Sequence, residues 1–124
     1  MAGLYIHIPF CLKKCPYCDF YSLPYDEALV DEYISSLLKE LSLYRISEPI
    51  ETIYFGGGTP SVLKPAQIER IINRIVSLYK LTSKPEVSLE ANPETLNRKV
   101  LEGFLSSGIN RLSLGIQSLQ DHEL

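Results

Sequence analysis

The chain has no cysteine outside one short segment. Cys11, Cys15 and Cys18 lie within eight residues, and no fourth cysteine occurs in the 124-residue sequence. An odd number of cysteines argues against a framework made only of disulfides. Electron-transfer iron–sulfur clusters are ordinarily held by four cysteines, which these residues alone cannot supply.

Several other features are missing, and each excludes a class of protein. No run of about 18 apolar residues is present, so no membrane span is expected. The N-terminus lacks a basic region followed by an apolar run, so it does not resemble a signal peptide, and we expect a cytoplasmic protein. The net charge is −3, which gives no basic field to attract nucleic acid.

Short strand-like segments alternate with longer helical ones. Strands are predicted at residues 4–8, 52–55, 87–91 and 111–117. Helices are expected after Asp26, which can cap a helix, from Pro65, and from Asn92-Pro93 to a stop at Gly108. Four strand–helix units in this order predict an α/β fold with a parallel sheet and right-handed crossovers.

The predicted strands alternate apolar and polar residues, whereas parallel strands are usually apolar on both faces. Tyr5 and His7 oppose Leu4, Ile6 and Ile8, and Ser88 and Glu90 oppose Val87, Leu89 and Ala91. The apolar face has helices to cover it. The polar face is best explained as the lumen of a barrel or half-barrel, whose active site lies at the carboxyl ends of the strands.

The end of the chain leads to a further expectation. Residues 120–124 resemble the start of a fourth helix. A four-stranded parallel sheet would leave an open edge at this point. We therefore expect residues 1–124 to be an incomplete domain, with the rest of the barrel supplied by a missing part.

The cysteine segment predicts a metal cluster. Three thiolates in a Cys-x₃-Cys-x₂-Cys loop can hold three corners of a cubane and leave one iron free for another ligand. Two alternatives remain open. Zinc would need a fourth ligand, for which His7 is the nearest candidate. Cys15-Pro16-Tyr17-Cys18 alone resembles a dithiol redox site of the glutaredoxin kind.

The cysteine loop also resembles the signature of the radical S-adenosylmethionine (SAM) superfamily. Its flanks, Tyr5 to Cys11 and Cys15 to Phe20, are similar to the oxygen-independent coproporphyrinogen III oxidase family. Three further blocks agree in order: residues 56–61 (GGGTPS), 90–94 (EANPE) and 110–118 (NRLSLGIQS). The resemblance covers essentially the whole chain and implies the N-terminal part of a radical SAM partial TIM barrel.

The resemblance implies a role for ten residues. Cys11, Cys15 and Cys18 would ligate a [4Fe-4S] cluster, whose open iron would bind SAM and cleave it to a 5′-deoxyadenosyl radical. The residues implied to contact SAM are Tyr5, Tyr17, Gly57, Gly58, Thr59, Glu90 and Gln117.

From the residues alone, simpler explanations of the SAM contacts stay open. The glycine run can be a tight turn between a strand and a helix. Glu90 can cap the third helix or pair with Arg111. The tyrosines can pack in a core, and Gln117 can be an ordinary polar end of a strand.

One residue distinguishes two branches of the resembled family. The porphyrin-oxidising (dehydrogenase) branch typically has a further cysteine two residues after the third, where this chain has Phe20. This favours the HemW-type heme chaperone branch. That branch implies heme as a ligand, an acceptor protein for the heme and a reductant for the cluster. The alternative function is oxidative decarboxylation of coproporphyrinogen III to protoporphyrinogen IX.

Overall fold

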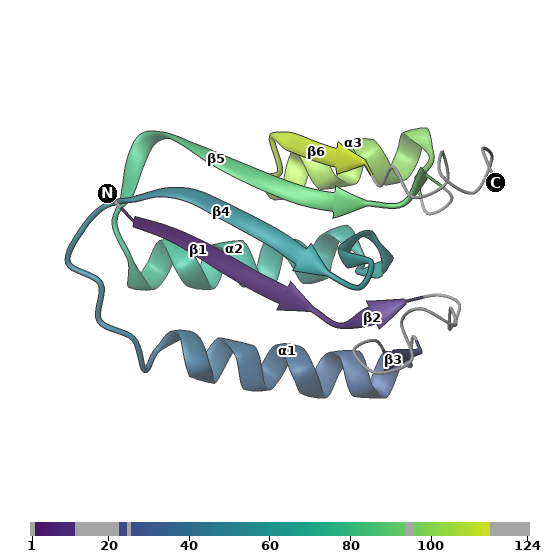
Figure 1. The fold of residues 1–124 in the computed structure, drawn as a ribbon, viewed down its shortest axis with the longest axis horizontal. Helices are drawn as coiled ribbons and strands as arrows, with labels where there is room; N and C mark the ends of the chain where they lie inside the picture. The colour runs from purple at the N-terminus through teal and green to yellow at the C-terminus, as the bar shows by residue number, and fades with distance from the viewer. Residues whose placement is uncertain (1, 12–22, 25, 94–95, 115–124) are drawn as a thin grey trace, which may run out of the picture.

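The computed structural model describes residues 2–11, 23–24, 26–93 and 96–114. Its main sheet has the strand order β1-β4-β5-β6, and all neighbouring strands are parallel. The strands are β1 (Ala2–Ile8), β4 (Ile50–Gly57), β5 (Leu81–Ala91) and β6 (Arg111–Leu114). The helices are α1 (Glu27–Leu41), α2 (Pro65–Leu78) and α3 (Arg98–Ser107). The α/β prediction is therefore confirmed (Figure 1).

Three short elements complete the described structure. β2 (Phe10–Cys11) and β3 (Leu23–Pro24) form a separate parallel pair, and a 3-10 helix, η2 (Pro60–Val62), follows the glycine run. Neither β2 nor β3 is among the strands predicted from the sequence. A two-residue pairing has no periodic pattern by which it could be recognised.

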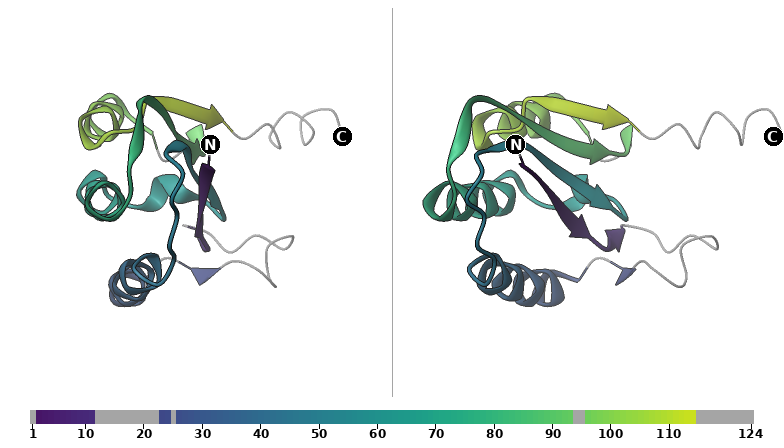
Figure 2. Two further views of the ribbon diagram at one scale, coloured as in Figure 1. Left: turned by 90° about the vertical axis from the view of Figure 1, so that its left-hand side faces the viewer. Right: turned by 60° about the vertical axis from the view of Figure 1, so that its left-hand side comes forward.

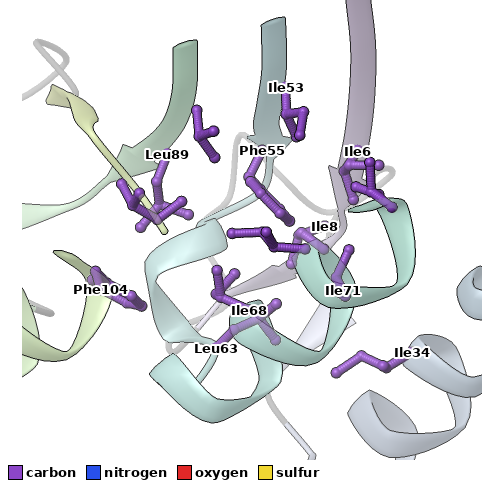
Figure 3. Close-up of a cluster of buried hydrophobic side chains, with 14 of the residues drawn as sticks. Ile6, Ile8, Ile34, Ile53, Phe55, Leu63, Ile68, Ile71, Leu89 and Phe104 are labelled. Atoms are coloured by element: carbon purple, nitrogen blue, oxygen red, sulfur yellow. The ribbon is translucent and has the colours of Figure 1, made fainter. Parts of the chain in front are cut away.

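The three helices lie on one face of the main sheet, as both views in Figure 2 show. Alternation along the strands sends apolar side chains toward these helices. The resulting core has a strand layer and a helix layer (Figure 3). Fully buried members include Ile8, Ile53, Phe55 and Leu89 from the strands and Ile34, Ile68, Ile71 and Phe104 from the helices. No described helix covers the opposite side, which we call the open face.

Local signals explain most helix ends. The Asp26 carboxylate accepts hydrogen bonds from the amides of Ala28 and Leu29 at the start of α1. Pro65 occupies the first turn of α2, where a missing N–H is harmless. Gly108 ends α3 with a φ of 119°, a conformation that favours glycine.

The predicted start of the third helix is wrong. α3 begins at Arg98, and its N-cap is Asn97, whose side-chain oxygen accepts a 2.8 Å hydrogen bond from the Val100 amide. Asn92 instead directly follows β5, and its backbone amide donates to the Ser61 hydroxyl. Both asparagines are good caps in isolation. The end of β5 decides which one begins the helix.

The other differences from the predictions concern the ends of strands. β4 and β5 are longer than predicted, and residues 115–117 of the fourth predicted strand lie outside the described residues. Within the described residues, no helix combines the length and hydrophobicity needed to cross a bilayer.

Candidate functional site

The open face carries polar and aromatic side chains in register across the strands. Tyr5, Tyr54, Ser88 and Arg111 form one row, because each is the pairing partner of the next. The next row toward the carboxyl ends of the strands contains two pairs, His7 with Gly56 and Glu90 with Ser113. The predicted polar face therefore exists, and its aromatic and carboxylate groups converge at the edge where parallel folds bind ligands.

Glu90 is held at this edge by β4. The Tyr54 hydroxyl donates a 2.9 Å hydrogen bond to Glu90 Oε2, and the Gly57 amide donates a 3.0 Å hydrogen bond to Glu90 Oε1. Each carboxylate oxygen has two lone-pair sites, so each can accept a further hydrogen bond. Glu90 is therefore oriented and can still accept two hydroxyl groups from a ligand.

The structure rules out both simpler explanations of Glu90. Arg111 pairs with Glu86, with 3.5 Å between Nη1 and Oε2, and Glu90 uses its oxygens on Tyr54 and Gly57. Glu90 does not cap α3 either, because Asn97 does so. The carboxylate belongs to the edge of the open face.

Glycine is required at two positions of the glycine run. Gly57 has a φ of 120°, and a Cβ atom there would lie 2.7 Å from the Ile8 carbonyl oxygen and 2.9 Å from the His7 ring. A Cβ atom at Gly56 would lie within 2.9 Å of the rings of Tyr5 and Tyr54. The missing side chains allow backbone and rings to approach closely.

The tyrosines of β1 and β4 form a stacked pair on the open face. Their ring centroids are 5.8 Å apart with an interplanar angle of 16°, and Tyr5 is 59% exposed. Burial, and then the hydrogen bond to Glu90, raise the pKa of Tyr54, although a hydrogen bond with Ser113 opposes the rise. Burial and the charge of Glu90 raise the pKa of Tyr5. Both hydroxyls are protonated at neutral pH and can donate.

The glycine run is tied to the segment that carries the first cysteine. The Gly58 amide donates to the Ile8 carbonyl and the Thr59 amide to the Phe10 carbonyl, both at 2.8 Å. Cys11 follows Phe10 at the end of β2. Five of the residues implied by the resemblance are thus brought to one edge together with the backbone of Cys11. They are Tyr5, Gly57, Gly58, Thr59 and Glu90.

The remaining predicted site residues, Cys15, Tyr17, Cys18 and Gln117, lie outside the described residues. Within the part that the structure describes, no three His, Cys, Asp or Glu side chains are grouped to hold a metal ion. The cysteine ligands therefore remain a prediction.

Sequence reasoning missed Tyr54. Alternation in residues 52–55 would have placed Thr52 and Tyr54 on the polar face beside Tyr5. The contact with Glu90 spans 36 residues and depends on the pairing of β4 with β5. The hydroxyl of Ser88, in the same row, is buried. Among the buried side-chain nitrogen and oxygen atoms of the described residues, it alone has no hydrogen bond.

Comparison with known proteins identifies the family. Residues 5–124 match the model of the radical SAM superfamily. The chain belongs to this superfamily. Radical SAM proteins use SAM and a [4Fe-4S] cluster. The open-face residues fit SAM, because the oriented Glu90 carboxylate keeps acceptor sites for hydroxyl groups and lies near the strand end that carries Cys11.

The relatives of this radical SAM chain include heme chaperones. It is 44% identical to the heme chaperone HemW of Buchnera aphidicola (subspecies Schizaphis graminum), over 94% of this chain and 32% of the relative. It is 37% identical to Escherichia coli HemW, over 98% and 33%. It is 38% identical to the mitochondrial radical S-adenosyl methionine domain-containing protein 1 of Bos taurus, over 99% and 28%. The chain thus spans about a third of their length.

A solved structure agrees with the fold. The coproporphyrinogen III oxidase HemN from E. coli, a radical SAM enzyme, superposes with a TM-score of 0.81 at 31% identity, over 92% of this chain and 27% of that one. The predicted α/β radical SAM fold is therefore confirmed.

Proposed function

We propose that this chain is part of the radical SAM core domain of a HemW-type heme chaperone. The protein would bind SAM at a three-cysteine [4Fe-4S] cluster, bind heme and pass the heme to an acceptor protein. The observation that carries the SAM part is the oriented Glu90 carboxylate beside the glycine run, at the edge where Cys11 begins the cysteine loop.

Each residue has a distinct task in this proposal. Cys11, Cys15 and Cys18 would hold the cluster, which supplies the electron for SAM cleavage when it is bound. Glu90 would accept two hydroxyl hydrogen bonds from the ribose of SAM. Gly57, Gly58 and Thr59 would present backbone groups to the cofactor, and Tyr5, Tyr17 and Gln117 would complete its surroundings.

Support for the heme part comes from the relatives and from Phe20. The three relatives quoted above include two named heme chaperones. Phe20 occupies the position where the porphyrin-oxidising branch typically has another cysteine. A heme chaperone also needs an acceptor protein, and its cluster needs a reductant. We propose that both act with this protein in the cytoplasm.

Anaerobic reconstitution tests the cluster. With iron and sulfide, the purified protein should develop the broad visible absorption of an iron–sulfur cluster and bind SAM. If it binds zinc and shows no such absorption, the cluster proposal is wrong. If no cluster forms and Cys15 and Cys18 instead form a disulfide bond with each other, the result supports the dithiol redox alternative.

Heme binding tests the chaperone function. We expect one heme per protein in a spectroscopic titration, with no loss of propionate carboxyl groups. The solved structure of HemN favours a second candidate, oxidation of coproporphyrinogen III to protoporphyrinogen IX. Formation of protoporphyrinogen with consumption of SAM would support that enzyme and contradict the chaperone proposal.

A further inference from the structure

Tyr54 contacts the carboxylate proposed to bind SAM, and none of the assigned roles includes it. Its hydroxyl donates to Glu90 Oε2 at 2.9 Å, from the strand next to the one that carries Glu90. The Gly57 amide, also from β4, holds the other oxygen at 3.0 Å. The carboxylate is therefore held by two donors from the same neighbouring strand.

Holding both oxygens has a consequence for binding. A partly exposed glutamate ordinarily samples several rotamers, and fixing it on ligand binding costs conformational entropy. Two donors restrict the Glu90 carboxylate before a ligand arrives. This orients the remaining acceptor sites and lowers the entropy cost of binding.

Tyr54 is itself held in place. Its ring stacks on Tyr5 at a centroid distance of 5.8 Å, and its Cε1 atom lies 2.9 Å from where a Cβ atom of residue 56 would be. Only glycine at position 56 leaves this space. Burial also raises the pKa of Tyr54, so its hydroxyl keeps the proton that it donates.

We propose that Tyr54 is a positioning residue for SAM: its hydroxyl orients the Glu90 carboxylate toward the two ribose hydroxyls. This inference rests on the proposed function, because it assumes that Glu90 binds SAM. It adds a residue that acts through Glu90 and has no need to touch the cofactor.

The test compares two tyrosine-to-phenylalanine variants in the reconstituted protein. Tyr54→Phe keeps the ring and removes the hydroxyl. Tyr44→Phe is the matched control, because the Tyr44 hydroxyl also donates to a glutamate, Glu40, at 3.2 Å, near the end of α1 and away from the site. Anaerobic equilibrium dialysis measures Kd for SAM and for methionine, which has the amino and carboxylate groups but no ribose.

We expect Tyr54→Phe to weaken SAM binding about tenfold, the effect of one hydrogen bond to a charged group. Methionine binding, cluster absorption and the far-ultraviolet circular dichroism should stay at wild-type values. Tyr44→Phe should leave both Kd values unchanged. In a Glu90→Ala background, Tyr54→Phe should change the Kd for SAM less than about twofold, because the two residues act as a unit.

Other outcomes would contradict either the positioning role of Tyr54 or the SAM-binding role of Glu90. If Glu90→Ala weakens SAM binding and Tyr54→Phe does not, the positioning role is wrong and the SAM role of Glu90 stands. If neither variant weakens SAM binding, the role of Glu90 is itself wrong. An equal effect of Tyr54→Phe with and without Glu90, or an equal loss of methionine binding, would mean that Tyr54 acts directly or through the fold.

Discussion

Replacement of Gly57 by alanine should destabilise the protein more than the same change at Gly108. Both glycines have nearly the same φ, 120° and 119°, which L-residues rarely adopt. Their surroundings differ. A Cβ atom at residue 108 would meet the flexible end of Ile72 at 3.2 Å, whereas at residue 57 it would meet the Ile8 carbonyl oxygen at 2.7 Å.

The expected magnitudes follow from these contacts. A left-handed conformation costs an L-residue roughly 1–2 kcal/mol, which is our expectation for Gly108→Ala. Gly57→Ala carries the same strain plus overpacking of about 1–3 kcal/mol. The Ile8 carbonyl cannot easily move away, because it accepts the 2.8 Å hydrogen bond of the Gly58 amide. We therefore expect a total of about 2–5 kcal/mol for Gly57→Ala, with the upper part of this range favoured by the fixed carbonyl.

Urea unfolding of the metal-free protein, followed by circular dichroism, measures both values. Gly57→Ala should also weaken SAM binding in reconstituted protein, because the residue 57 amide holds Glu90. Gly108→Ala should leave SAM binding unchanged, since residue 108 lies just before β6, at the amino ends of the strands, whereas the site is at the carboxyl ends. Equal destabilisation by the two variants would refute the role of the Ile8 carbonyl.

Three further predictions concern other parts of the molecule. Cys11→Ala should abolish the visible absorption of the reconstituted cluster, because the chain has no spare cysteine; a retained cluster would show that another ligand replaces it. Asn97→Ala should lower the free energy of unfolding by about 1 kcal/mol through loss of the bond to Val100, and Asn97→Ser should recover most of it; no loss would contradict the cap. The raised pKa of Tyr54 means that the folded state holds this proton more tightly. This stabilisation is present below the unfolded pKa of about 10 and is lost as the pH rises through the pKa of the folded state. In measurements of the free energy of unfolding against pH, Tyr54→Phe should therefore show a smaller loss of stability above about pH 10.

Local chemistry explains why much of the fold is predictable. Alternation in β1 and β5 marks the two faces of the sheet, because side chains of a strand point to opposite sides in turn. Asp26, Pro65 and Gly108 mark helix ends, since their effects act within one turn. The start of α3 was not predictable in this way, because Asn92 and Asn97 are equivalent caps.

By itself, the sequence determined the parallel α/β order, the polar face and the candidate cofactor residues, all of which depend on periods of two to four residues and on short motifs. Only the tertiary structure decided which polar groups meet. Arg111 pairs in register with Ser88, which places it between Glu86 and Glu90. Arg111 forms an ion pair with Glu86, and Glu90 accepts hydrogen bonds from Tyr54 and Gly57. That choice depends on strand register, which joins residues more than thirty positions apart.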